Sequence, residues 1–168
     1  ITVYIDDDED GFPLSDDCDD ENPAIHPGAA DPLDDAGIDQ DCDGEDVAPA
    51  LTWVNVPADT LELAVTVTDP DAGGFVHWIV YGIDPTRTGL LEGELPSEAL
   101  LWQNSFGNDQ WDGPCPPAGP PHTYRFTVHA LNQQLEVADD ASAAEVISVL
   151  DLIAIGQASV SGSYERAS

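Results

Sequence analysis

The sequence predicts a mostly β fold with one helix near its C-terminal end. Residues 61–68, 75–83 and 124–131 are rich in β-branched and aromatic side chains and are typical of strands. The second and third of these segments are apolar at most positions, as expected of strands buried on both faces of a sandwich core. With 42% hydrophobic residues, the chain of 168 residues has enough apolar side chain for one core.

Residues 141–155 have the spacing of a helix. Val146, Val149, Leu150 and Ile153 recur at helical intervals, and Gly156 is a typical stop. Residues 157–164 then fit a last strand. This part of the chain contains no internal repeat, so we do not expect a solenoid.

The chain is strongly acidic, because 34 Asp and Glu residues stand against 3 Lys and Arg residues and give a formal net charge of -31 at pH 7. Nucleic-acid binding needs a basic footprint, which Arg87, Arg125 and Arg166 cannot supply. The same argument disfavours an anionic membrane surface. No apolar run approaches the roughly 20 residues that cross a bilayer.

Eighteen of the 34 acids lie in residues 1–46, which contain no Lys or Arg. We therefore divide the chain into an acidic segment, residues 1–46, and a β-rich body, residues 47–168. Blocks of like charge are usually solvated and disordered, but these acids are regularly spaced. Adaptation to high salt is a second explanation of the acidity and stays open beside metal binding.

The spacing of the acids predicts calcium binding. A pattern close to D-x-[DN]-x-[DN]-G, with a carboxylate at the twelfth position, brings alternate oxygens onto one hard cation. The expected ligands of the first loop, including one backbone carbonyl, are Asp6, Asp8, Asp10, Phe12 and Asp17. The six-residue signature returns as a second, incomplete loop, for which the expected ligands are Asp39, Asp41 and Asp43, completed by nearby acids such as Asp19.

Cys18 and Cys42 stand in similar acidic contexts. A disulfide between them would staple a segment that has almost no apolar core, which indicates an oxidising compartment. Zinc is the competing interpretation, but these two Cys residues lack zinc spacing, and an oxygen-rich set of ligands favours calcium. We therefore expect a secreted or cell-surface protein. The chain starts at Ile1 and has no Met, so we expect any targeting signal to have been removed.

Residues 16–20, 25–29 and 37–44 form a longer pattern. In this order they resemble the Asp/Cys-rich metal-binding repeat of bacterial surface proteins, which is itself similar to thrombospondin type 3 calcium repeats. His26 lies in this pattern just before Pro27. We interpret it as a turn residue rather than a copper or zinc ligand, because no second His is nearby in the sequence.

Polar side chains in the β-rich body indicate a second candidate site. Asp69 ends the first predicted strand, His77 lies inside the second, and His122 and Tyr124 open the third. Strand alternation places Phe126 on the same face as His122 and Tyr124. His and Tyr would donate hydrogen bonds to a small anion, while Asp69 would fix a His tautomer or receive an amine. The alternative is that each His is a hydrogen-bonded core residue.

Several motifs occur in this order along the body: Asp69-Pro70-Asp71-Ala72, Val76-His77-Trp78, Gly113-Pro114-Cys115-Pro116-Pro117 and His122-x-Tyr124. Together they resemble the phosphatidylethanolamine-binding protein family, and in particular its bacterial, Raf-kinase-inhibitor-like branch. The resemblance implies a β-sandwich with a small anion pocket. The residues that map onto this pocket are Asp69, His77, Gly113, Pro114, His122 and Tyr124. It also implies that residues 1–5 hold the family's first strand, with the acidic repeat inserted after it.

Two positions depart from the family pattern. Gly73 stands where a Pro is expected after Ala72, and Thr123 stands where an Arg is usual. We expect the first change to loosen a wall of the pocket and the second to remove a positive charge near the anion. Both weaken the case for phosphate or a phospholipid headgroup, especially in so negative a protein.

We do not expect an enzyme. Ser97 and Ser105 lack the G-x-S-x-G context of a nucleophile, and Cys115 lies between prolines. The leading interpretation is a secreted, calcium-binding β-sandwich that binds a small anion or a phospholipid headgroup. The alternative is a structural subunit of a calcium-stabilised filament, surface layer or matrix, which would self-assemble or bind another extracellular protein and keep only a vestigial pocket.

Overall fold

The computed structural model describes residues 48–117 and 119–165. Its elements, in chain order, are β1 (Leu51–Thr52), β2 (Glu62–Asp69), β3 (Phe75–Ile83), β4 (Gly89–Leu90), β5 (Leu100–Leu101), β6 (His122–Leu131), α1 (Ala143–Ile153) and β7 (Ala154–Tyr164). One sheet has the order β5-β3-β2-β6-β7, and β1 pairs with β4 in a second, smaller sheet. The strand pairs are antiparallel. The predicted class, mostly β with one helix, is confirmed.

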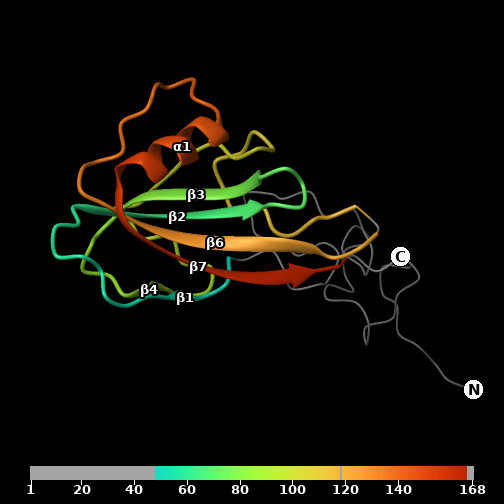
Figure 1. Cartoon of the computed structure of the whole chain (residues 1–168), viewed down its shortest axis with the longest axis horizontal. Coiled ribbons are helices and arrows are strands. Elements are labelled where there is room, and N and C mark those ends of the chain that lie inside the picture. The colour runs from blue at the N-terminus through green and yellow to red at the C-terminus, as the bar shows by residue number, and fades with distance from the viewer. Residues whose placement is uncertain (1–47, 118, 166–168) are drawn as a thin grey trace, which may run out of the picture. The chain divides into compact units, whose positions relative to one another are not determined.

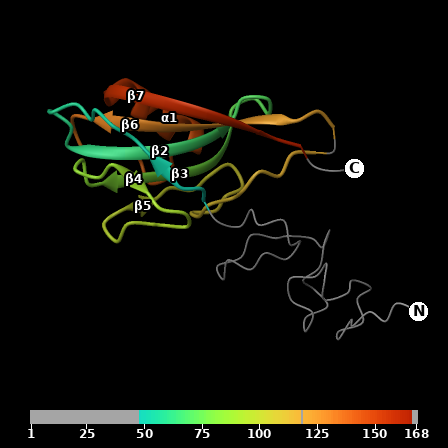
Figure 2. The ribbon, with the colours of Figure 1, turned by 90° about the horizontal axis from the view of Figure 1, so that it is seen from below.

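The five-stranded sheet is covered on both faces, by α1 on one side and by β1 and β4 on the other (Figures 1 and 2). Alternation along β2 sends Leu63 and Val65 to the side of the small sheet and Ala64 to the side of the helix. Two core clusters result. Between the sheets lie, among others, Trp53, Leu63, Val65, Val67, Trp78, Val80 and Leu90. Under the helix lie Ala64, Val76, Ile79, Leu131, Ala143, Val146 and Leu150.

Burial on both faces holds for β3 but only in part for β6. All residues from Val76 to Val80 are buried. In β6, Tyr124 and the last three residues, 129–131, are buried, whereas Arg125 is exposed. The end of β6 near His129 lies close to α1, and the end that carries Arg125 has a face open to solvent.

The helix is shorter than predicted. It begins after Ser142, whose side chain accepts a hydrogen bond from the N–H of Glu145, while the Glu145 carboxylate accepts one from the Ser142 N–H. It ends at Ile153, because Ala154 is already extended and begins β7. The prediction that Gly156 stops the helix is therefore wrong. Gly156 lies inside β7, where a Cβ would come within 3.0 Å of the Cγ atom of Pro57.

The short strands β1, β4 and β5 complete the fold around the long strands β2, β3, β6 and β7. β1 and β4 pair through Leu51 with Leu90 and through Thr52 with Gly89. β5 adds to the open edge of β3. Among the described residues, no helix has the length and apolar character that a membrane span requires.

Candidate ligand-binding site

The turn between β2 and β3 is organised by the carboxylate of Asp69. Oδ1 of Asp69 accepts hydrogen bonds from the backbone N–H groups of Asp71 (2.9 Å) and Ala72 (3.0 Å), as in an Asx turn. Gly73 and Gly74 follow with φ values of 72° and 84° and bond back to carbonyls at the start of the turn. Proline cannot adopt a positive φ. Gly73 thus adopts a backbone conformation that proline could not, and hydrogen bonds close the turn. The expected loosening of the pocket wall stays a prediction.

The other carboxylate oxygen of Asp69 faces His122 at the start of β6. Nδ1 of His122 lies 2.6 Å from Oδ2 of Asp69. Because an ionised carboxylate can only accept, this nitrogen carries a proton. Asp69 is only 2% exposed, and the pairing of β2 with β6 brings the two residues together. Asp69 is therefore placed to fix the tautomer of His122.

His77 in β3 is held in a defined tautomer. Its Nδ1 donates to the backbone oxygens of Asp112 (2.9 Å) and Gly113 (3.1 Å), and its Nε2 makes no hydrogen bond within the described residues. The ring is 3% exposed. Desolvation lowers the pKa of His77, against the opposing effects of the two carbonyls and of the negative charges of Asp69 and Asp112. At pH 7 we therefore expect a neutral ring whose Nε2 is a hydrogen-bond acceptor.

Aromatic side chains surround His77 and fix the plane of its ring. Its centroid lies 5.4 Å from that of Phe75, 5.5 Å from that of Phe106 and 5.1 Å from that of Tyr124, each in an edge-to-face arrangement. Such contacts add to the burial energy of the rings. They also bring Tyr124 of β6 against His77 of β3.

The hydroxyl of Tyr124 is buried without a hydrogen-bond partner in the described part of the chain. Desolvation raises the pKa of Tyr124 to about 12, and the charge of Asp69 acts in the same direction. The backbone N–H of Cys115 is near enough to oppose this rise but does not reach hydrogen-bond geometry. An unsatisfied buried group of this kind costs about 1–3 kcal/mol. The phenol is therefore a neutral group whose donor is unused within the described residues.

Asp112 is a buried carboxylate that the sequence did not single out. It is 0% exposed. Its Oδ2 accepts hydrogen bonds from the side-chain amides of Asn104 (2.5 Å) and Asn108 (3.1 Å), and its Oδ1 accepts one from Gln110 (3.2 Å). Asn104 also donates to the backbone oxygen of His77. These amides tie the loop between β5 and β6 to β3.

Thr123 takes part in the site through its backbone. Its N–H donates to Oδ2 of Asp71 at 2.7 Å. This bond is the main cause that lowers the pKa of Asp71. The position at which the resemblance implies an Arg therefore supplies a backbone contact to a carboxylate and no positive side chain.

The structure brings together most of the residues predicted for this site. Asp69 contacts His122, and His77 contacts Tyr124. Gly113 contributes its carbonyl oxygen to His77. Pro114 follows Gly113 as a half-buried residue.

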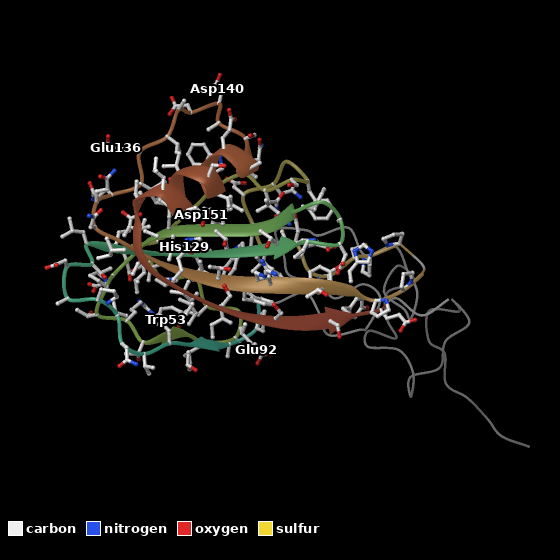
Figure 3. The ribbon with its side chains drawn as sticks, viewed as in Figure 1. Trp53, Glu92, His129, Glu136, Asp140 and Asp151 are labelled. Atoms are coloured by element: carbon white, nitrogen blue, oxygen red, sulfur yellow. The ribbon has the colours of Figure 1, made fainter. Side chains whose placement is uncertain are left out.

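A second polar cluster lies on the helix side of the sheet and was also missed; His129 and Thr66 are its buried members, whereas Asp151 and Gln157 are exposed. His129 of β6 lies near Asp151 of α1 (Figure 3), with 3.8 Å between Nδ1 and Oδ1. The Gln157 amide donates to both of these atoms, at 3.0 and 2.7 Å. Nε2 of His129 therefore carries the proton and donates to Oγ1 of Thr66 at 3.0 Å. Burial lowers the pKa of His129, while the charge of Asp151 opposes this shift.

The predicted calcium and disulfide residues lie outside the described part of the chain. They are Asp6, Asp8, Asp10, Phe12, Asp17, Asp19, Asp39, Asp41, Asp43, Cys18 and Cys42. The suggested first strand, residues 1–5, lies outside it as well. Within residues 48–117 and 119–165, no cluster of three or more His, Cys, Asp or Glu side chains could hold a metal ion. Calcium binding and the disulfide thus stay predictions.

Comparison with known proteins assigns the fold and motifs to a family. Residues 24–165 match the phosphatidylethanolamine-binding protein family. The chain is 37% identical over 132 residues to a UPF0098 protein of Methanothermobacter thermautotrophicus, with 74% of this chain and 87% of that protein covered. It is 42% identical over 127 residues to the lipoprotein LppC of Mycobacterium tuberculosis, with 74% of this chain and 63% of LppC covered.

The crystal structure of Escherichia coli YbcL, described as a member of the mammalian PEBP family, superposes with a TM-score of 0.67. It is 37% identical in sequence, and the match covers 72% of this chain and 81% of that chain. The fold is a β-sandwich, and the polar cluster between its long strands is a candidate ligand site. The chain belongs to the phosphatidylethanolamine-binding protein family, as its motifs indicated. These similarities do not establish the predicted calcium repeat.

Proposed function

We propose that the site around Asp69, His77, His122 and Tyr124 binds a small oxyanion such as phosphate or a phosphorylated headgroup. The unpartnered, buried hydroxyl of Tyr124 carries this proposal. It lies against His77, whose Nε2 is also without a hydrogen bond in the described residues. Tyr124 offers a donor to an anion oxygen, whereas Nε2 of His77 is an acceptor and suits a ligand group that donates a hydrogen bond.

The charge of the site sets a limit on affinity. Asp69 and Asp71 place two carboxylates beside the His122 ring, and Thr123 supplies no positive side chain in return. A dianion therefore meets a negative local field. We expect weak binding that depends on hydrogen bonds and on the protonation of the ligand more than on charge attraction.

Proton and nitrogen NMR of the His rings tests this proposal. Addition of inorganic phosphate or phosphoethanolamine should shift the ring resonances of His77 and His122. The ring of His129 provides an internal control, because it lies on the helix side of the sheet and is already bonded to Thr66 and Gln157. If no His ring responds at tens of millimolar ligand, the site does not bind oxyanions.

We propose that binding is not followed by catalysis. The hydroxyl oxygen of Ser105 accepts a hydrogen bond from the Val76 N–H, and the Ser97 hydroxyl donates to Glu98, so both have structural contacts. Neither is paired with a His among the described residues. Turnover of p-nitrophenyl phosphate or p-nitrophenyl acetate that is lost in His77→Gln would overturn this view.

We also propose that residues 1–46 bind calcium and that the protein acts outside the cytoplasm. Support comes from the spacing of the acids and from the similarity to a protein named as a lipoprotein. Calorimetric titration with calcium should give heats that are lost in the double variant Asp6→Ala, Asp10→Ala. Unchanged calcium binding in that variant would refute the assignment of the first loop.

One feature favours assembly as a second candidate function. β7 is 11 residues long, carries no charged side chain and, among the described residues, pairs only with β6. An uncharged sheet edge can accept a further strand. Calcium-dependent light scattering that EDTA reverses would support assembly, and a monomer in millimolar calcium would count against it.

A further inference from the structure

We propose that the site selects an oxyanion that brings its own proton, such as hydrogen phosphate or the monoanion of a phosphate monoester, and that Asp112 is the positioning residue that sets this selectivity. The inference rests on the proposed function and narrows its ligand class. It follows from the hydrogen bonds of His77 and of the loop that holds His77 in place.

The tautomer of His77 is set by the protein backbone. Nδ1 faces two carbonyl oxygens, those of Asp112 at 2.9 Å and Gly113 at 3.1 Å. Carbonyls only accept hydrogen bonds, so the proton of the neutral ring stays on Nδ1. The other tautomer would place a nitrogen lone pair against two carbonyl oxygens. Nε2 is consequently an acceptor in the neutral protein, and a ligand that contacts it must donate.

Asp112 holds these carbonyls in place. Its buried carboxylate accepts from Asn104 at 2.5 Å, from Asn108 at 3.1 Å and from Gln110 at 3.2 Å. Asn104 donates at the same time to the backbone oxygen of His77 at 3.1 Å. The Asp112 side chain therefore accepts hydrogen bonds from three side-chain amides of its own loop. Through one of them, Asn104, it fixes that loop to β3. A buried carboxylate solvated by amides alone is costly unless all of them are in place.

Burial keeps His77 neutral in the free protein, against the charged groups that face it. Asp69 and Asp112 are negative and favour the imidazolium, but burial among Phe75, Phe106 and Tyr124 outweighs them and lowers the pKa. The neighbouring Tyr124 is a neutral donor. A ligand at this place thus meets a donor at Tyr124 and an acceptor at His77.

This pair of groups distinguishes oxyanions by their protonation. Hydrogen phosphate or a monoester monoanion can accept from Tyr124 and donate its P–O–H to His77. Sulfate has no proton at neutral pH, and its oxygen lone pairs would oppose that of Nε2. A phosphodiester, the form of phosphate in an intact phospholipid headgroup, lacks the acidic O–H as well. The site should therefore prefer free phosphate or a monoester to a diester.

Calorimetric titration at pH 6.5 with four probes tests the inference: inorganic phosphate, phosphoethanolamine, glycerophosphoethanolamine and sulfate. Inorganic phosphate keeps a P–O–H at this pH, and we expect it to bind at least about tenfold more tightly than glycerophosphoethanolamine or sulfate. Phosphoethanolamine is partly deprotonated at pH 6.5 because the second pKa of a phosphate monoester is about 6, so its affinity should lie between these and rise as the pH is lowered toward 6. Equal affinity for phosphate and sulfate would overturn the inference while the proposed function stands. If none of the four binds, the proposed function itself fails.

Variants separate selectivity from folding. Tyr124→Phe removes a donor and should weaken all probes that bind by a similar factor, so that the ratio of phosphate to sulfate affinity persists. His77→Gln presents an amide that can donate or accept and should bring this ratio close to one. A tenfold ratio that survives in His77→Gln would overturn the inference.

Asp112→Asn tests the positioning role. The variant removes the charge and two of the acceptor interactions but keeps the shape of the side chain, and its fold can be followed by the near-UV signal of Trp78 and Trp111. In folded protein we expect the ratio of phosphate to sulfate affinity to fall at least about threefold. If Asp112→Asn does not fold, Asn108→Ala removes one hydrogen bond to the Asp112 carboxylate. It should lower the ratio of phosphate to sulfate affinity in the same direction. An unchanged ratio in either folded variant removes Asp112 from this role.

Discussion

Nδ1 of His77 donates a hydrogen bond to the backbone oxygen of Asp112, a residue 35 positions later in the chain, at 2.9 Å. This bond joins a central strand to the loop between β5 and β6. The same loop is fixed by Asn104, whose amide group donates to the His77 and Gln110 backbone oxygens and to Asp112. The orientation of one ring in the site therefore depends on a network of buried amides.

Replacement of Asn104 should destabilise the protein strongly. Asn104→Ala leaves the buried Asp112 carboxylate without its shortest hydrogen bond and frees two backbone oxygens, so we expect a loss of about 2–4 kcal/mol in the free energy of unfolding. Urea denaturation measures this loss. Gln103→Ala is the matched control, because Gln103 is exposed and donates only to the Gly107 oxygen. Its effect should stay within about 1 kcal/mol, and similar losses in both variants would contradict this account.

Tyr124→Phe should separate stability from binding. Removal of a buried hydroxyl that lacks a partner should leave the free energy of unfolding unchanged or raise it by up to about 1 kcal/mol. Phosphate affinity should fall at the same time, because the donor is lost. Urea denaturation and calorimetry give the two quantities. A clear loss of stability would mean that the hydroxyl is bonded inside the protein.

The stability of the protein should decrease in mild acid through His129. Its folded pKa lies below the ordinary value of 6.5, because burial disfavours the imidazolium. Between that lowered pKa and 6.5 the unfolded chain binds more protons than the folded one, so the free energy of unfolding falls as pH drops through this window. His77 contributes with the same sign. Urea denaturation from pH 8 to pH 5 measures the slope.

His129→Gln removes one of the two histidines, His129 and His77, that make the free energy of unfolding depend on pH. The variant should be less stable at pH 7, since the bond to Thr66 and the acceptor for Gln157 are altered. Its curve of stability against pH should nevertheless be flatter below pH 6.5 than that of the unchanged protein. Parallel curves over the whole range would show that His129 does not titrate in the unfolding reaction.

Two glycines of β7 make a matched pair for packing. A Cβ at Gly156 would lie 3.0 Å from Cγ of Pro57, whereas a Cβ at Gly162 would meet nothing within 4 Å. We expect Gly156→Ala to cost about 1–3 kcal/mol through overpacking and Gly162→Ala to be neutral or slightly stabilising. Thermal or urea unfolding compares the two. Equal effects would mean that Pro57 moves freely.

The sequence located the long strands because their signals are local. The predicted range 75–83 coincides with β3, since turn residues bound a continuous apolar run on both sides. The end of α1 had no such signal. Ile153, Ala154 and Ile155 fit a helix or a strand equally well, and pairing of β7 with β6 decides in favour of the strand. The start of α1 could have been found from Ser142 and Glu145, which spell a capping box.

The residues of the candidate site also fall into two groups, those that the sequence could predict and those that it could not. Asp69, His77, His122 and Tyr124 lie in short motifs at strand ends, so the sequence could propose them. Asp112 could not be recognised, because its burial depends on amides from Asn104, Asn108 and Gln110 that only the folded loop brings together. His129 was missed for a similar reason, since its partners come from three separate elements.

The pairing of β7 with β6 extends over ten residue pairs, from His122 with Tyr164 to Leu131 with Ala154. β6 carries His122 and Tyr124, yet β7 is the last of the described elements to leave the ribosome. Until it has emerged, one whole edge of β6 has no backbone partner on that side, and the nascent chain exposes a strand that can template misassembly. Protection of this edge of β6 is thus a late event in folding, and a chain that stops within α1 should aggregate rather than form a smaller sandwich.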